Sequence, residues 1–217
     1  MMAKYIADSG VKKIDFLRSE VFRFKNIIFD LDNTIFPEEI YDLFAFRAIG
    51  SDLLKLNDKD AYQFANKAIA LKAIDRAFLF NRLLQDEKEI CIQELVDFYQ
   101  NYSFGKKLRY FSIRPFLIEL YELGKDLYIV TNGHPVRQNN KIRDIGIERY
   151  FKSIYVCHPD TDNPLKPNPQ VLQKIINSRD RKEFIMVGDD KNIDGIFAEH
   201  SGISFFNFSV LSSDFKI

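Results

Sequence analysis

Five aspartates follow apolar segments of the chain and could form a charged site. Asp30 and Asp32 directly follow the apolar run 27–29, and Asp189, Asp190 and Asp194 follow the run 184–187. Two unit charges about 4 Å apart repel by roughly 4 kcal/mol at an effective dielectric constant of about 20. Carboxylates gathered in one place therefore need a cation. Oxygen ligands without a cysteine or histidine cluster favour a hard divalent ion, and we expect Mg²⁺.

Two further segments could hold an anion beside such a metal. Thr131, Asn132 and Gly133 follow an apolar run and precede a segment expected to be helical. A hydroxyl group and backbone N–H groups at the start of a helix can bind a phosphate. Lys166, in a proline-containing loop, adds a fixed positive charge. A metal site, an anion site and paired aspartates together indicate phosphoryl chemistry.

These residues need a scaffold that brings distant segments together, and the apolar runs supply one. Runs at 27–29, 127–130, 153–156 and 184–187 have the composition of buried strands, and each ends in polar residues. From Pro115 onward, expected strands and helices alternate. Such alternation predicts an α/β fold with a mostly parallel sheet between helices. The carboxyl ends of parallel strands lie at one edge, where open α/β sheets bind their ligands.

The segment from about Tyr41 to about Ser103 has a different amino-acid composition. It lacks proline, has no glycine after Gly50, and repeats alanine, leucine and phenylalanine at helical spacing. We expect four helices there, with boundaries near 57–58, near 74–75 and at Asp86. The predicted domains are a core of residues 1–35 and 113–217 and an all-helical insert of residues 36–112. Residues 1–24 should form a short extension that packs one face on the core.

The composition excludes several classes of protein. Among 217 residues, 46% are hydrophobic, and 31 basic residues balance 31 acidic ones. A net charge of zero argues against nucleic acid polymers and anionic membranes as partners. Cys91 and Cys157 lie far apart, which suits reduced thiols better than a disulfide framework. No window approaches the ~20 apolar residues of a membrane span. We expect a cytoplasmic protein, and the sequence does not indicate an oligomeric state.

Four motifs, taken in order, resemble those of the haloacid dehalogenase (HAD) superfamily. They are Asp30-Leu31-Asp32-Asn33-Thr34, Thr131-Asn132-Gly133, Lys166-Pro167-Asn168-Pro169, and Gly188-Asp189-Asp190 with Asp194. Gln138, Lys141, Gly146, Tyr150-Phe151 and Gly202 are also similar to capped members of that superfamily. The resemblance implies a three-layer, Rossmann-like core with a helical cap inserted after the first motif. This cap coincides with the helical insert expected from composition.

The resemblance also implies a role for each motif residue. Asp30 would be the nucleophile that forms an aspartyl-phosphate, and Asp32 the general acid and base. The superfamily's dehalogenases lack the second aspartate, so Asp32 favours phosphate esters. Thr131, Asn132 and Gly133 would bind the phosphate, and Lys166 would bridge the nucleophile and the phosphate. Asp189 would bind the metal together with Asp30 and the backbone carbonyl of Asp32. Asp190 and Asp194 would support metal-bound water or Lys166.

The expected function is that of a Mg²⁺-dependent phosphatase. Its substrate would be a small-molecule phosphate ester, either a sugar phosphate or a nucleotide monophosphate. Alternatives are a pyrimidine 5′-nucleotidase and a phosphoglucomutase-like phosphotransferase. A hypothesis of another class is an inactive binding or regulatory module. The joint presence of Asp30, Asp32, Thr131, Lys166 and Asp189 argues against it.

Overall fold

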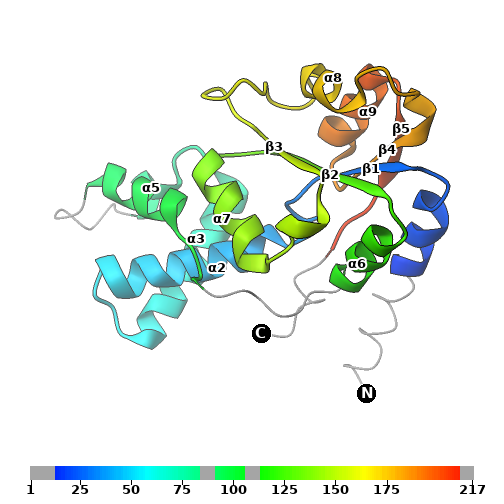
Figure 1. The fold of residues 1–217 in the computed structure, drawn as a ribbon. Helices are drawn as coiled ribbons and strands as arrows, with labels where there is room; N and C mark the ends of the chain where they lie inside the picture. Colours follow the sequence, from blue (N-terminus) through cyan, green and yellow to red (C-terminus); the bar gives the residue numbers. More distant parts are fainter. Residues whose placement is uncertain (1–12, 84–90, 106–112, 211–217) are drawn as a thin grey trace. The chain divides into compact units, whose positions relative to one another are not determined.

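The structure is a computed structural model that describes residues 13–83, 91–105 and 113–210 (Figure 1). It separates into two compact units. One consists of Met1–Pro37 with Lys107–Ile217, and we call it the core unit. The other, Glu38–Lys106, is the helical unit. The chain thus leaves the core after its first strand and returns to it later.

The core unit is built on one parallel sheet of five strands in the order β3-β2-β1-β4-β5. Its strands are β1 (Asn26–Phe29), β2 (Asp126–Asn132), β3 (Ser153–Cys157), β4 (Phe184–Gly188) and β5 (Ser204–Asn207). All four residues of β1 are buried at the centre of the sheet. The strand order reverses direction between β1 and β4, and such a switch point is where open α/β sheets form a ligand site.

Helices cover both faces of this sheet. On one face lie α8 (Gln170–Ile176) and α9 (Ile196–Ser201), and on the other α6 (Arg114–Glu122) and α7 (Pro135–Ile145) (Figure 1). Val171, Ile175 and Phe197 join the sheet residues Ile28 and Tyr128 in one buried cluster. Short turns complete the unit at η2 (Glu148–Tyr150), η3 (Arg181–Glu183) and η4 (Lys191–Gly195). The predicted three-layer α/β fold is confirmed.

Of the expected extension, residues 13–21 are helical and pack on the core unit, whereas residues 1–12 lie outside the described residues. Leu17 and Val21 are fully buried, and Phe24 is nearly so. Arg18 forms an ion pair of 2.8 Å with Glu119 of α6. The helical stretch after β4 begins at Lys191, with the wide turn η4. It begins there because the Asp190 side chain accepts hydrogen bonds from the backbone N–H groups of Asn192 and Ile193.

The helical unit contains the predicted helices. They are α2 (Glu38–Ala48), α3 (Asp58–Ile74), α4 (Leu79–Leu83) and α5 (Ile92–Asn101), with the wide turn η1 (Ile49–Leu53) after α2. Asn57 caps α3 by accepting a hydrogen bond of 3.1 Å from the backbone of Asp60. A Cβ atom on Gly50 would lie 2.9 Å from Ala61 Cα, so glycine allows close packing against α3. The boundary expected at Asp86 lies outside the described residues.

No helix within 13–83, 91–105 and 113–210 has the length and apolar character needed to cross a membrane.

Arg179 joins the amino-terminal ends of the two central strands. Its Nη1 atom donates to Asn26 Oδ1 at 2.7 Å, to the Tyr128 hydroxyl at 3.0 Å and to Asp126 Oδ2 at 3.3 Å. Asn26 is fully buried. A buried carbonyl oxygen without a hydrogen-bond donor destabilises the folded state by its full desolvation free energy. Arg179 therefore helps to fix β1 against β2 at the edge opposite the motif residues.

We predict that Arg179→Met lowers the free energy of unfolding by about 1–3 kcal/mol, because Asn26 Oδ1 loses a donor in the interior. Urea denaturation measures this change. Lys182→Met removes a nearby exposed cation and should change stability by no more than about 0.5 kcal/mol. Equal losses in the two variants would contradict the assigned role of Arg179.

Candidate active site

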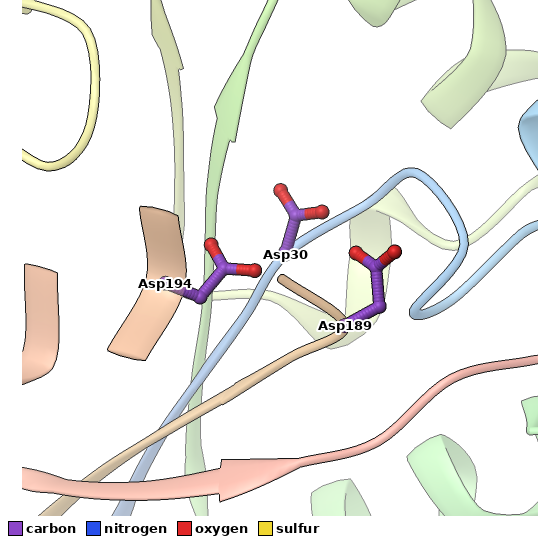
Figure 2. Close-up of side chains that lie close together, drawn as sticks. All are labelled: Asp30, Asp189 and Asp194. Carbon is purple, nitrogen blue, oxygen red and sulfur yellow. The ribbon is translucent and has the colours of Figure 1, made fainter. Parts of the chain in front are cut away.

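Three carboxylates from separate segments meet beyond the carboxyl ends of β1 and β4. Asp30 directly follows β1, Asp189 follows β4, and Asp194 lies in η4. Each offers an oxygen atom, and these atoms all lie within 4.8 Å of one another. Figure 2 shows the three side chains gathered in this way. The parallel pairing of Phe29 with Val187 sets the two strand ends side by side.

Lys166 lies inside this carboxylate cluster. Its Nζ atom is 2.7 Å from Asp30 Oδ1 and 2.6 Å from Asp194 Oδ1, and all three side chains are buried. Burial by itself would lower the pKa of Lys166, but the two carboxylates raise it above its usual value. The lysine therefore carries a permanent positive charge between the two aspartates.

Asn132 fixes the loop that carries Lys166. Its Oδ1 atom accepts a hydrogen bond from the Lys166 backbone N–H at 2.8 Å, and its Nδ2 atom donates to the Lys166 carbonyl at 3.1 Å. Asn132 is the last residue of β2, so the sheet positions the lysine. The Asn132 side chain thus holds the lysine loop, and the expected contact of its backbone N–H with a phosphate stays a prediction.

Burial sets the protonation behaviour of the cluster. It raises the pKa of Asp30 to about 7, with Lys166 opposing the rise and Asp194 adding to it. Burial and the charge of Asp194 likewise raise the pKa of Asp189 to about 6. Three acidic side chains with one lysine favour an additional cation, and oxygen ligands of this kind fit Mg²⁺. The residues present are thus suited to the expected metal.

The structure gives different surroundings to Asp190 and Asp194, to which the family resemblance assigned one shared supporting role. A Cβ atom on Gly188 would lie 2.2 Å from Asp194 Oδ2, so only glycine leaves room for this carboxylate. Asp194 is buried against Lys166, whereas Asp190 is half-buried and its side chain caps η4. Asp194 therefore belongs to the carboxylate cluster, and Asp190 holds the turn that positions it.

A second polar cluster, formed by Asp32, Thr131, Gln138 and Lys141, connects the first two motifs with α7. Asp32 Oδ1 lies 2.6 Å from Lys141 Nζ, and Asp32 Oδ2 accepts a hydrogen bond of 2.9 Å from Gln138 Nε2. Gln138 Nε2 also lies 2.9 Å from Thr131 Oγ1. The charge of Asp32 contributes to the raised pKa of Asp30, so the second cluster acts electrostatically on the first.

Gly133 makes this second cluster possible. Its φ angle of 149° is rare for residues with a side chain, and a Cβ atom there would lie 3.0 Å from Gln138 Cγ. Sequence reasoning noted Gln138 and Lys141 only as family-like residues and did not assign them to the site. Their spacing of three residues places them on one face of a helix, and this was the available signal.

Comparison with known proteins identifies the family. A family model described as haloacid dehalogenase-like hydrolase matches residues 27–208. The phosphoglycolate phosphatase of Vibrio vulnificus is 29% identical over 194 residues, covering 85% of this chain and 83% of that protein. The glyceraldehyde 3-phosphate phosphatase of Methanothermobacter thermautotrophicus is 25% identical over 190 residues, covering 83% of each.

A solved structure has the same fold. The HAD-hydrolase YfnB of Bacillus subtilis, bound to magnesium, is 22% identical and superposes with a TM-score of 0.60. The match covers 84% of this chain and 87% of that one. Together with the ordered motifs and the helices inserted between β1 and β2, the family match over most of the chain leads to one conclusion: this protein belongs to the haloacid dehalogenase-like hydrolases.

Proposed function

We propose that this HAD-like phosphatase hydrolyses a small phosphorylated metabolite, in the first place a sugar phosphate, through an aspartyl-phosphate on Asp30. The observation that carries the proposal is the carboxylate cluster with Lys166 in its interior. Such a cluster can neutralise a phosphate and a metal beside a nucleophilic carboxylate. We retain the expected core of residues 1–35 and 113–217 and cap of residues 36–112 as part of this proposal.

In the proposed reaction, an Asp30 carboxylate oxygen attacks phosphorus and the bond to the ester oxygen breaks. Asp32 gives its proton to the departing oxygen. A water molecule then attacks the phosphorus, Asp32 takes the proton of that water, and the bond between Asp30 and phosphorus breaks. Thr131 and the backbone N–H groups of Asn132 and Gly133 bind the phosphoryl oxygens, and Lys166 stabilises the charge that spreads over them.

The proposed metal ligands are Asp30, Asp189 and the backbone carbonyl of Asp32. Bound Mg²⁺ supplies charge neutralisation at the phosphate and orients it for in-line attack. The relative YfnB was crystallised with magnesium. In this chain Asp194 holds Lys166, and Asp190 supports the turn below the metal ligands.

Relatives named for phosphoglycolate and glyceraldehyde 3-phosphate support a substrate of two or three carbons. A triose phosphate is a sugar phosphate, so this favours the sugar phosphates over the nucleotides in our expectation. The pyrimidine 5′-nucleotidase and the phosphoglucomutase-like phosphotransferase remain the alternatives. An inactive binding module would have no need for a buried nucleophile held beside Lys166.

We predict that Asp30→Asn abolishes hydrolysis of phosphate esters, because an amide cannot serve as the nucleophile. The thermal unfolding temperature should stay equal or rise, since the variant removes a buried acidic group whose charged form is disfavoured by burial. Glu199→Gln, at an exposed position, is the matched control and should keep activity. Turnover by Asp30→Asn at the wild-type rate would exclude Asp30 as nucleophile.

We predict that the affinity for Mg²⁺ falls as the pH drops below about 7. The proton competes with the metal at Asp30, whose pKa is about 7, and at Asp189, whose pKa is about 6. Below both values the loss should approach roughly 100-fold per pH unit, because binding then displaces two protons. Titration calorimetry between about pH 8 and about pH 5.5 measures this slope. A pH-independent affinity would refute metal binding at these carboxylates.

The same raised pKa values predict how stability depends on pH without metal. The folded state holds protons on Asp30 and Asp189 at pH values where the unfolded chain has released them. The free energy of unfolding should therefore decrease as the pH rises from about 4 to about 7. Added Mg²⁺ should offset this decrease at the upper end. Urea denaturation with and without chelator tests both signs.

A panel of substrates tests the choice of ester. Phosphoglycolate, glyceraldehyde 3-phosphate, hexose phosphates and pyrimidine nucleotides are compared by kcat/KM, with release of inorganic phosphate as the measurement. We expect the two small esters and the sugar phosphates to exceed the nucleotides. A preference for pyrimidine nucleotides would favour the nucleotidase, and conversion of a sugar phosphate to its isomer without phosphate release would favour the mutase.

A further inference from the structure

The side of α7 that carries Gln138 and Lys141 is polar and yet buried. Both side chains are 1% exposed, although glutamine and lysine are rarely removed from water. A buried lysine costs free energy unless its charge is paired with good geometry. Lys141 is paired with Asp32 at 2.6 Å. Burying these polar groups costs desolvation free energy, which apolar side chains on the same helix face would not cost.

The two side chains hold different oxygen atoms of one carboxylate. Lys141 binds Asp32 Oδ1, and Gln138 donates to Asp32 Oδ2. A carboxylate that is held through one oxygen can still swing about its last torsion. Fixing both oxygens from two residues of a rigid helix restricts this rotation. The arrangement therefore defines the direction in which Asp32 presents its oxygens.

Gln138 also links this carboxylate to the anion site. Its Nε2 atom lies 2.9 Å from Thr131 Oγ1 and 3.1 Å from the carbonyl oxygen of Asn132. The glycine at 133 leaves room for the glutamine side chain, which a Cβ atom would displace. One amide group therefore contacts both the proton-transferring residue and the phosphate-binding segment.

We propose that Gln138 and Lys141 are positioning residues that aim the Asp32 carboxylate for its two proton transfers. The proposal rests on the role of Asp32 in the proposed function. It adds that α7 aligns Asp32 with the phosphate held at Thr131. A displacement of about 1 Å in such a group can cost on the order of 100-fold in rate.

Substrates with different leaving groups can show whether Gln138 and Lys141 position Asp32 or only stabilise the fold. Nitrophenolate departs as a stable anion and needs no proton, whereas an alkoxide such as that of glycerol phosphate must be protonated. Asp32 is thus needed in the first step only for the alkyl ester. It is needed in the second step for both esters, because the attacking water must lose a proton.

The experiment measures both steps by rapid quench with p-nitrophenyl phosphate and with glycerol phosphate, at saturating Mg²⁺. The variants are Lys141→Met and Gln138→Met, with Asp32→Asn as the reference. Arg143→Met is the matched control, because it removes an exposed cation from the same helix. Gln138→Met removes an uncharged group and carries the same test if Lys141→Met does not fold.

We expect both variants to release the first nitrophenolate nearly as fast as wild type and then to lose phosphate from Asp30 more slowly by about 10-fold or more. With glycerol phosphate the first step should slow as well. Asp32→Asn should give the same pattern more strongly, and Arg143→Met should behave as wild type. Equal slowing of every step with both esters, or wild-type rates in both variants, would overturn the positioning role.

The two proposals fail in distinguishable ways. The aspartyl-phosphate accumulates only where its hydrolysis is slower than its formation, and Asp32→Asn should meet this condition with p-nitrophenyl phosphate. Absence of a phosphorylated Asp32→Asn enzyme in the quench would overturn the proposed function itself. A phosphorylated Asp32→Asn variant, but with wild-type rates in Gln138→Met and Lys141→Met, would retain the proposed function and reject the positioning residues.

Discussion

The ion pairs of Lys166 with Asp30 and Asp194 are the interaction on which this site depends. Carboxylates removed from water and set within a few ångströms of one another repel strongly, and a buried cation is what allows them to stay together. The compensation is incomplete, because the pKa values of Asp30 and Asp189 remain well above the usual range. The protein thereby keeps a preformed place for one more cation, which a neutral or apolar cluster would not provide.

Strand pairing, a glycine and one asparagine side chain make these ion pairs possible. Parallel pairing of β1 with β4 brings Asp30 and Asp189 to neighbouring strand ends at the switch point of the sheet. The missing side chain of Gly188 creates the space that Asp194 occupies. Asn132 then holds the main chain of Lys166 from both sides. Gly188 and Asn132 carry no charge, yet they determine where Asp194 and Lys166 lie.

The two aspartates of the first motif are supported separately although one residue divides them. Asp30 is held by Lys166 from the loop before α8, whereas Asp32 is held by Lys141 and Gln138 from α7. Asp30 is buried and Asp32 is half-buried. Asp30 and Asp32 are chemically identical, but they face different cations and differ in solvent exposure. Such a difference in environment is what allows two carboxylates to have different chemical roles.

The sequence by itself determined the α/β class, the helical insert and the family. Runs of apolar strand residues and short motifs consist of neighbouring residues, so the sequence displays them and their order directly. It also supplied Asp30, Asp32, Thr131, Lys166 and Asp189 as candidates. Tertiary structure alone separated Asp194 from Asp190 and brought Gln138 and Lys141 to Asp32. These pairings join residues up to 109 positions apart, and the chosen partner depends on register, on helix rotation and on space left by glycine. None of these is encoded in the spacing of a single segment.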